Sequence, residues 1–430
     1  FGNHHFKVMA GFNQESSYQE TLDTYSYNQA VLDVPAMSSG TGTIKATDSY
    51  SEYAIRGGFF RVNYNYLDKY LLEVNGRYDG SSKFPKSSRF GFFPSVSAGW
   101  QIAQERFMNS TRHWLDGLKL RASYGVIGNQ NINPYTFTPS MSVNNKATSW
   151  IIDDTYVTSI SSLPALVSQN FTWEKVGTIN VGLDVNLFNN RLSGVFEWYQ
   201  RNTNGMLAPG VQLPAVVGAS APYQNTADMR TRGWELSLNW RDQIGKVGYR
   251  IGFNLSDYKS EIIKYDDNAA TKLLSSYYPG QTLGEIWGYV VDGYYTVDDF
   301  VDTSSWQLKE GVTSINGYNV RPGDVKFKNL RDDDTSTNVI TSGDNTFDNP
   351  GDRKVIGNTT PRYQYGINLG MNYAGFDLNV ILQGTGKRDY WISNVLTFPM
   401  NGDNFVPLFE GLSDYWMPKD PDNGDWSAVN

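Results

Sequence analysis

Few side chains in this sequence could perform acid–base, nucleophilic or redox chemistry. It contains no cysteine and only three histidines, His4, His5 and His113. Without thiols the chain has no disulfide framework, no thiolate metal site and no cysteine nucleophile. No Ser-His-Asp set, paired carboxylates or metal-ligand spacing stands out from the background. We therefore predict a protein that is not an enzyme and that uses no cofactor and no metal.

The acidic stretch 332–352 (DDDTSTNVITSGDNTFDNPGD) is the one segment with many oxygen ligands of the kind that Ca²⁺ prefers. Counted from Asp332, however, position 6 is Thr337 rather than glycine, and position 12 is Gly343 rather than glutamate. Counting from Asp344 fails too, because Asn349 then occupies the glycine position. The pattern favours a solvated acidic loop, with calcium binding as the alternative.

Aromatic side chains in the predicted loops are the best candidates for ligand contact. A ring in a loop can stack on a sugar face or pack against a peptide side chain, although it can equally pack within its own loop. The predicted substrate-binding residues are Trp150, Trp287, Tyr294, Tyr295 and Trp391.

Composition and charge narrow the class of protein. The chain of 430 residues carries 36 Lys+Arg against 44 Asp+Glu, a formal charge of −8, which argues against a nucleic-acid partner. The 12 Trp, 28 Tyr, 22 Phe and 41 Gly suit long strands better than helices. The longest uncharged run, 202–227, holds three prolines and cannot cross a membrane as a helix. The first residues lack the features of a signal peptide.

Strict alternation of apolar and polar residues recurs along the chain and predicts strands. Residues 234–241 (WELSLNWR) and 363–373 (YQYGINLGMNY) are examples. We expect Leu236, Leu238, Ile367 and Leu369 on one face of the sheet, and Ser237, Asn239, Asn368 and Gly370 on the other. Eleven strands are predicted, at 4–14, 54–66, 69–79, 90–103, 116–127, 172–187, 190–203, 230–241, 246–262, 361–373 and 376–390.

The connections between these strands alternate in length. Short turns are predicted at 67–68, 104–115, 188–189, 242–245 and 374–375. Long loops are predicted at 15–53, 80–89, 128–171, 204–229 and 263–360. This alternation is typical of an antiparallel up-and-down transmembrane β-barrel with short periplasmic turns and long extracellular loops. Most segments also exceed the 5–6 residues or so of a typical soluble strand. A soluble β-rich protein is the alternative.

An odd number of strands is unusual, because bacterial single-chain barrels have an even number. We therefore expect residues 1–430 to form part of a larger outer-membrane barrel whose closing strands are absent from this chain. The polar faces carry charges that are expected to line the lumen and to hydrate its wall. These are Glu73, Arg77, Glu174, Asp184, Glu235, Arg241 and Asp377.

Five long segments of the sequence match one known family. The segments are RYDGSSKFPKSSRFGFFPSVSAGWQIAQERFM (77–108), LKLRASYGVIGNQ (118–130), FTWEKVGTINVGLDVNLFNNRLSGVFEWYQRNT (171–203), MRTRGWELSLNW (229–240) and GDRKVIGNTTPRYQYGINLGMNYAGFDLNVILQGTG (351–386). Together they cover most of residues 54–390, and in order and spacing they resemble the TonB-dependent transporters of the SusC/RagA type.

The resemblance implies part of a 22-stranded barrel with a plugged lumen, in the outer membrane of a Gram-negative bacterium and in contact with its lipid. It also implies that the plug domain is absent from this chain and that the charges of the lumen could pair with that plug. It implies active import of oligosaccharides or peptides, with a SusD-like surface lipoprotein as a lid and energy from TonB–ExbB–ExbD through an N-terminal part. Which of the two cargoes is carried stays open. The alternatives are a passive or siderophore-type outer-membrane barrel and a β-rich glycan-binding surface module.

The 98-residue connection 263–360 is too rich in large apolar side chains for a disordered tract, notably in residues 286–295 (IWGYVVDGYY). An exposed apolar cluster of this kind either folds over its own loop or meets a partner. We expect this connection to be ordered and to supply part of the interface with the lid.

Overall fold

The computed structural model describes residues 2–31, 33, 36–141, 164–168, 171–211, 213–268, 271–273, 277–331 and 338–392, together with short strands within 143–161 and 418–428. Contacts divide the chain into two compact units, residues 1–232 with 238–240, and residues 233–237 with 241–430. Among the described residues, no helix has the length and hydrophobicity needed to cross a membrane.

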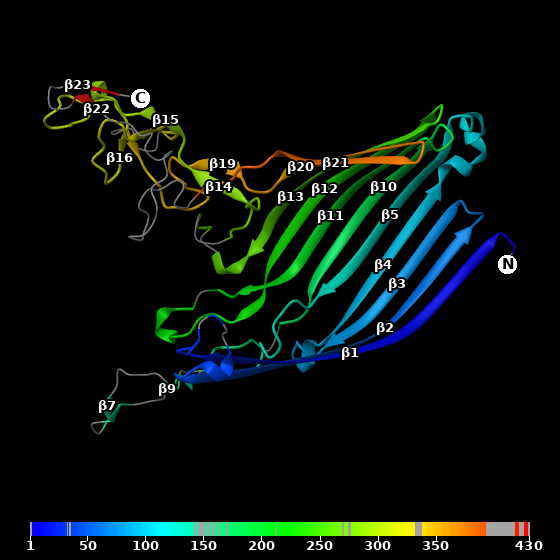
Figure 1. Ribbon diagram of the computed structural model, residues 1–430, viewed down its shortest axis with the longest axis horizontal. Coiled ribbons are helices and arrows are strands. Elements are labelled where there is room, and N and C mark those ends of the chain that lie inside the picture. Colours follow the sequence, from blue (N-terminus) through cyan, green and yellow to red (C-terminus); the bar gives the residue numbers. More distant parts are fainter. Residues whose placement is uncertain are drawn as a thin grey trace. The chain divides into compact units, whose positions relative to one another are not determined.

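Eleven long strands form a single sheet in sequence order (Figure 1). Each predicted strand is present, with ends shifted by a few residues or more. The strands are β1 (His4–Ser26), β2 (Ile44–Tyr66), β3 (Tyr70–Ser81), β4 (Phe90–Gln101), β5 (Leu115–Asn129), β10 (Glu174–Leu187), β11 (Leu192–Pro209), β12 (Tyr223–Ile244), β13 (Val247–Tyr265), β20 (Arg362–Tyr373) and β21 (Phe376–Lys387).

Two predicted loops are largely strand, so the prediction of long loops at 15–53 and 204–229 is wrong. β1 and β2 pair without interruption from His4↔Tyr66 to Ser26↔Ile44, and only 27–43 connects them. β11 and β12 likewise shorten the second loop to 210–222. In these extensions polar residues occupy both faces, so the alternation disappears although the backbone ladder continues. Alternation marks a strand only where one face must be apolar.

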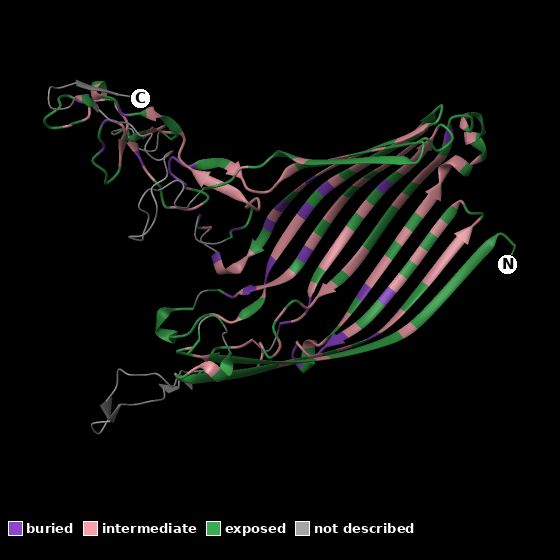
Figure 2. Ribbon diagram, viewed as in Figure 1, coloured by how far each residue is buried: buried purple, intermediate pink, exposed green. Residues whose placement is uncertain are grey.

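Pairing places the apolar residues of the first unit on one face of its strands. Across β1, β2 and β3, Phe6 is paired with Tyr64 and Tyr64 with Leu72. Large apolar side chains on this face are exposed, as a surface in contact with lipid would be. They include Phe6, Val8, Phe60, Leu72, Val74, Phe92, Val96, Leu120, Val181, Leu183, Phe196 and Trp198. In Figure 2, β1 is exposed along nearly its whole length, while more protected residues punctuate β3, β4 and β5.

The second unit keeps the same separation of faces. Leu369 is paired with Ile251 and with Val380, whereas Gly370 is paired with Arg250 and Asn379. The predicted opposition of Ile367 and Leu369 to Asn368 and Gly370 is therefore confirmed. Ser237 lies on the polar side too, since its Oγ is 2.8 Å from Asn254 Oδ1.

The connection between β13 and β20 is ordered in the residues that the structure describes. Short strands pair within it: β14 (Glu285–Gly288) with β19 (Lys354–Asn358), β15 (Val291–Tyr294) with β17 (Val325–Phe327), and β16 (Ser314–Ile315) with β18 (Val339–Ile340). Buried Tyr295, Phe300 and Val320 form a small core beside Trp306 and Leu308. The connection therefore has an apolar centre of its own, as its composition predicted.

The connection 102–114 between β4 and β5 is held by one carboxylate. Glu105 accepts hydrogen bonds from Tyr70 Oη (2.7 Å) and Trp100 Nε1 (3.2 Å) and pairs with Lys69 Nζ at 3.1 Å. The hydrogen bond from Tyr70, the contacts of Lys69 and the bond from Trp100 lower the pKa of Glu105 to about 2.

We expect Glu105→Gln to lower the thermal stability of the full-length protein at pH 7. A depressed folded-state pKa contributes stability above the unfolded-state value near 4.5, and this contribution is lost as the pH falls toward 2. The difference in unfolding temperature between variant and parent should therefore shrink between pH 5 and pH 2. The unfolding temperature is the one at which the heated barrel loses the gel mobility of its folded form. Glu310→Gln, at an exposed position in another connection, is the control. A difference that does not change with pH would contradict this account.

Candidate functional site

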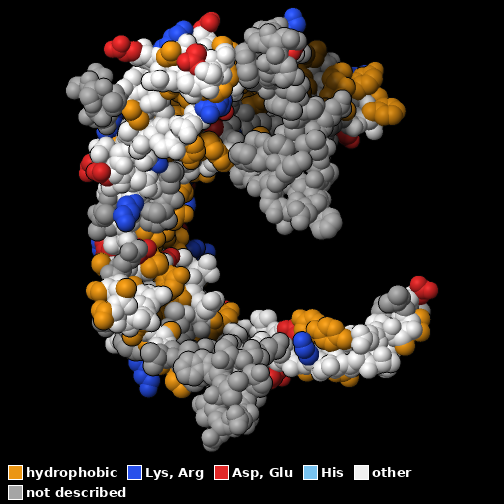
Figure 3. Space-filling view, turned by 90° about the vertical axis from the view of Figure 1, so that its left-hand side faces the viewer, with side chains coloured by type: hydrophobic (Ala, Val, Ile, Leu, Met, Phe, Trp, Pro, Cys, Tyr) orange, Lys and Arg blue, Asp and Glu red, His pale blue; other side chains and the backbone are white. Residues whose placement is uncertain are grey.

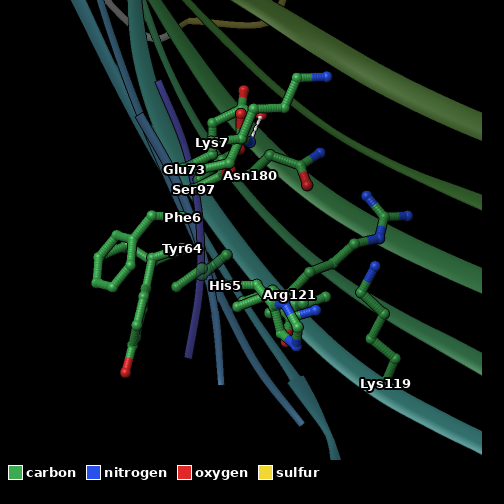
Figure 4. Close-up of a pocket in the computed structure, with 17 residues that line it drawn as sticks. His5, Phe6, Lys7, Tyr64, Glu73, Ser97, Lys119, Arg121 and Asn180 are labelled. Carbon is green, nitrogen blue, oxygen red and sulfur yellow. Dashed lines mark hydrogen bonds between the residues drawn. The ribbon is translucent and has the colours of Figure 1, made fainter. Parts of the chain in front are cut away.

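A groove of about 470 Å³ lies on the polar face of the first unit, over strands β1 to β5 and β10. In Figure 4, Phe6 and Tyr64 point to one side of the strands, while Lys7 and Asn180 point to the other. This opposition follows from the two-residue period of a strand. The polar side chains that line this groove, named here the polar groove, are His5, Lys7, Asn63, Asn65, Glu73, Ser97, Lys119, Arg121, Ser123 and Asn180.

Glu73 is at the centre of one set of cross-strand contacts in the polar groove. Its carboxylate accepts hydrogen bonds from Asn63 Nδ2 (2.5 Å) and Asn75 Nδ2 (2.8 Å). Arg61 Nε lies 3.9 Å from Glu73 and donates to Asn75 Oδ1 at 2.7 Å. The neighbouring strands β2 and β3 therefore share one hydrogen-bonded network, in which each charged group has a partner.

Arg121 on β5 is at the centre of a second set. Its Nε lies 3.1 Å from Asp184 Oδ1, and its Nη2 donates to Glu197. Asn180 Nδ2 donates to Glu197 Oε2 at 3.1 Å. One guanidinium thus contacts two carboxylates, and Lys119 is the cross-strand neighbour of one of them, Asp184.

A second groove, of about 710 Å³, shares Glu73, Ser97 and Ser123 with the first. Here Arg77 Nη2 lies 2.9 Å from Asp79 Oδ1, and the guanidinium stands over the Phe59 ring at 5.2 Å. The two grooves together form a continuous surface of cations, anions, amides, hydroxyls and rings. Such a surface can offer both hydrogen-bond donors and acceptors to a polar solute.

Four buried rings, Phe84, Phe93, Phe171 and Trp173, form one cluster, and two of them, Phe93 and Trp173, line the second groove. Trp173 Nε1 donates to the Arg89 carbonyl at 2.8 Å, and Ser88 Oγ donates to the Phe171 carbonyl at 2.7 Å. These hydrogen bonds fasten the connection 82–89 to the end of the much longer connection 130–173. The connection 82–89 is short, so the prediction of a long loop at 80–89 is wrong.

The predicted lining charges are distributed over both units. Glu73, Arg77 and Asp184 take part in the networks above, while Glu174 accepts hydrogen bonds from Asn129 Nδ2 and from the Leu207 amide. In the second unit, Arg241 and Asp377 line a separate groove of about 320 Å³. Glu235 is exposed. The alternation identified these positions, but the prediction missed Arg121, Glu197 and Arg61. These three residues also occupy polar positions in the alternating pattern, so the same pattern could have identified them.

The predicted aromatic contacts differ in accessibility. Trp150 lies outside the described residues. Tyr295 is fully buried, and its hydroxyl donates to the Thr313 carbonyl at 2.5 Å, so its ring is not available to a solute. Trp287 is half-buried, with Nε1 2.7 Å from Glu285 Oε1 and its ring against Phe347. Tyr294 and Trp391 remain 60% and 56% exposed. On the face viewed in Figure 3, hydrophobic side chains occur in small groups among charged ones.

The acidic stretch has an internal role in the part that the structure describes. Residues 332–337 lie outside that part. Asp352 is fully buried and accepts hydrogen bonds from the amides of Leu330 (2.8 Å), Arg331 (3.3 Å) and Thr341 (2.8 Å). Within the described residues, no group of three or more His, Cys, Asp or Glu side chains is arranged to hold a metal ion.

Comparison with known proteins gives a consistent set of similarities. The family model described as "TonB dependent receptor-like, beta-barrel" matches residues 1–417. TonB-dependent receptor P3 of Formosa agariphila is 28% identical over 405 residues, which are 90% of this chain and 37% of that protein. TonB-dependent receptor SusC of Bacteroides thetaiotaomicron is 35% identical over 209 residues, 48% of this chain and 20% of SusC.

The fold has a counterpart among solved structures. The RagAB peptide importer in its "open-open" state superposes with a TM-score of 0.69 at 23% identity, over 89% of this chain and 38% of the matched one. The chain thus spans well under half the length of the proteins that it matches.

Proposed function

The chain belongs to the TonB dependent receptor-like β-barrel family, whose model matches residues 1–417, and from this premise we propose that it forms part of the channel of a SusC/RagA-type importer. Proteins of this family lie in the outer membrane of Gram-negative bacteria. Residues 1–430 would be a segment of a larger barrel domain. The observation that carries the proposal is a sheet with exposed apolar side chains on one face and paired charges on the other.

The proposed cargo is an oligosaccharide or a peptide. The grooves present charges of both signs beside amides and hydroxyls, which suits a neutral or zwitterionic solute rather than one of high charge. The role is transport, and no catalytic step is part of the proposal. A passive or siderophore-type barrel is the second candidate, and the charged groove walls are compatible with it.

The proposed partners are a SusD-like surface lipoprotein that covers the outer mouth and the TonB–ExbB–ExbD complex. Contact with TonB would involve parts of the protein outside this chain. Support comes from the similarity to SusC and to a structure described as a peptide importer, RagAB. We include the long connection between β13 and β20 in the surface that meets the lipoprotein.

Uptake by cells tests the proposed function. Cells that produce the full-length protein and its neighbouring lipoprotein should accumulate a labelled oligosaccharide or a labelled peptide. Accumulation should stop when tonB is deleted. Uptake that is unchanged without TonB would indicate a passive barrel, and uptake of ferric siderophores alone would indicate the siderophore-type alternative.

We propose that Tyr294 and Trp391 contact the solute, as does Trp150, whereas Trp287 serves mainly to pack its own loop. Tyr294→Ala and Trp391→Ala should each weaken solute binding by about 2- to 10-fold, since an aromatic contact contributes about 0.5–1.5 kcal/mol. The measurement is calorimetric titration of the full-length transporter with the transported solute.

The matched control is Tyr318→Ala, which removes a 74% exposed ring from the same connection as Tyr294. It should leave the affinity unchanged. An equal loss of affinity in Tyr318→Ala would show that removal of any exposed ring perturbs the loop, and the assignment of Tyr294 would fail.

A further inference from the structure

Arg121 reaches its second carboxylate by crossing a neighbouring strand. Gly182 on β10 is paired with Arg121 on β5 and, on its other side, with Glu197 on β11. Neighbouring strands lie about 4.8 Å apart, so about 10 Å separates the backbones of Arg121 and Glu197. The guanidinium nevertheless donates through Nη2 to Glu197, while its Nε stays 3.1 Å from Asp184 Oδ1. The Arg121 side chain must therefore lie across Gly182.

A glycine at position 182 makes this crossing possible. Gly182 is buried, and a Cβ atom built on it would lie 2.7 Å from Arg121 Cζ and 2.9 Å from Arg121 Nε. Carbon atoms in contact are about 3.5–4.0 Å apart, so a side chain here and the guanidinium exclude each other. A glycine in a strand interior often marks a place where another group approaches closely. Here the approaching group is the flexible end of an arginine, which can move while the backbone of β10 stays in place.

The second unit contains the same arrangement. Gly370 on β20 is paired with Arg250 on β13 and with Asn379 on β21. Arg250 Nη2 donates to Asn379 Oδ1 at 2.5 Å, and a Cβ atom on Gly370 would lie 2.6 Å from Arg250 Cγ. Two arginines on different strands thus cross a neighbouring strand over a glycine. The crossing is therefore a recurrent feature of the polar face.

The position of Arg121 determines where its positive charge lies. Arg121 lines the polar groove, whereas its two carboxylate partners do not. On the side away from β10, Arg121 is paired with Gly99 on β4, which lines the groove as well. A Cβ atom on Gly99 would have Lys119 Cε, part of another flexible side chain, as its nearest neighbour at 3.2 Å. A guanidinium displaced from Gly182 therefore has the polar groove as the space open to it.

We propose that Gly182 is a positioning residue that holds Arg121 across β10 and keeps its charge out of the polar groove. A residue without a side chain thereby helps to set which charges a solute meets there. This inference rests on the proposed function and deepens it, because it identifies a determinant of the preference between neutral and anionic solutes. Such a preference is a difference between two affinities, and it changes when one charge moves.

The reactivity of individual arginines tests the position of Arg121. Phenylglyoxal modifies guanidinium groups that are free of close partners, and peptide mass spectrometry reports the rate at each arginine. In the full-length protein, Gly182→Ala should raise the rate at Arg121 severalfold. Gly177→Ala is the control in the same strand, because its Cβ atom would have no neighbour closer than 3.7 Å, and it should leave the rate unchanged. An unchanged rate at Arg121 in Gly182→Ala would overturn the proposal.

The second unit provides an independent pair of variants. Gly370→Ala should raise the reactivity of Arg250. Gly366→Ala, on the same strand and the same face, should not, because its Cβ atom would have no neighbour closer than 3.9 Å. Equal effects of the two variants on Arg250 would contradict the role of glycine in the crossing.

An Arg121→Ala background separates the effect on the arginine from an effect on the strand. Without a guanidinium over it, Gly182→Ala should change neither the unfolding temperature nor solute binding beyond the effect of Arg121→Ala alone. Failure of Gly182→Ala to fold only when Arg121 is present would support the proposal. Equal destabilisation in both backgrounds, or failure to fold in both, would mean that β10 itself requires the glycine, and would overturn the proposal.

Solute binding tests the consequence for charge preference. Calorimetry on the full-length transporter compares a neutral oligosaccharide with its uronate form, and a peptide amidated at its carboxyl terminus with the free acid. Gly182→Ala should raise the affinity for the anionic member relative to the neutral one by about two- to fivefold, the range of one partly exposed ion pair. Gly177→Ala should leave the ratio unchanged. An unchanged ratio in Gly182→Ala would overturn the inference and leave the proposed function intact. If the parent binds none of these solutes, the proposed function fails, and arginine reactivity still decides whether Gly182 positions Arg121.

Discussion

Asp352→Ala should destabilise the connection between β13 and β20 by about 2–4 kcal/mol, because three amides lose their acceptor and an unsatisfied buried donor costs about 1–3 kcal/mol. The total stays below three times that cost, because two of the amides belong to exposed residues, Leu330 and Arg331, where water can take the place of the carboxylate. These amides belong to Leu330, Arg331 and Thr341, on both sides of the acidic run. Hydrogen–deuterium exchange of the full-length protein should show the Leu330 and Thr341 amides exchanging about 30- to 1,000-fold faster, at 1.4 kcal/mol per factor of ten. The strands β13 and β20 should keep their protection.

Two further variants show whether the effect of Asp352→Ala comes from the loss of the buried carboxylate. Asp352→Asn keeps the shape and one carbonyl oxygen but directs an amide group at a backbone donor, so its effect should be intermediate. Asp348→Ala removes an exposed carboxylate from the same connection and should change nothing. Unchanged exchange in Asp352→Ala would mean that the buried carboxylate does not hold the connection together.

Trp173→Ala should be the most disruptive single truncation in the first unit. Its ring is 5.0 Å from Phe84 and 5.3 Å from Phe93 between ring centroids, and the side chain is almost fully buried. Truncation of a buried tryptophan to alanine typically costs about 3–5 kcal/mol. Loss of the hydrogen bond from Nε1 to the Arg89 carbonyl should in addition free the connection 82–89.

Two measurements follow for Trp173→Ala in the full-length protein. The variant barrel should lose its folded gel mobility at a lower temperature than the parent barrel does. The amides in 82–89 should lose their protection against hydrogen–deuterium exchange. Trp114→Ala, the same truncation at an exposed position of the first unit, is the control and should alter neither. Faster exchange throughout the sheet, without a preference for 82–89, would mean that the ring cluster supports the barrel as a whole and does not fasten the two connections.

The strands could be predicted because each of them needs one apolar face and one polar face. Where one face of a strand must be apolar and the other polar, the sequence alternates, and all eleven long strands carry this pattern over part of their length. The last residues of β1, 15–26, had no such signal. In residues 15–26 polar side chains face both ways, and only the backbone pairing with β2 reveals the strand. The pattern therefore could not predict how far a strand continues past the residues that have one apolar face.

The contacts of the candidate site were harder to predict than its positions. Alternation puts Arg121 on the polar face, but its two acidic partners depend on the register of β5, β10 and β11, and Glu197 is 76 residues away in sequence. Adjacent Tyr294 and Tyr295 present a related difficulty. Neighbouring residues in an extended segment point to opposite sides, so one of the two was expected to be buried, but only the packing of Phe300 and Val320 identifies Tyr295 as that residue.

The long connection has a consequence for the order of folding. Arg362 and Asp257, which form a two-pronged ion pair between β20 and β13, are 105 residues apart in sequence, whereas the other neighbouring strands are joined by shorter segments. Closing a loop of this length costs about 2 kcal/mol more than closing one of ten residues. Early formation of the core around Tyr295 and of the β14–β19 pairing would shorten the flexible chain that remains to be closed. We therefore expect β13 and β20 to join after the hairpin β20–β21 has formed, with a rate that depends on how fast the connection itself folds.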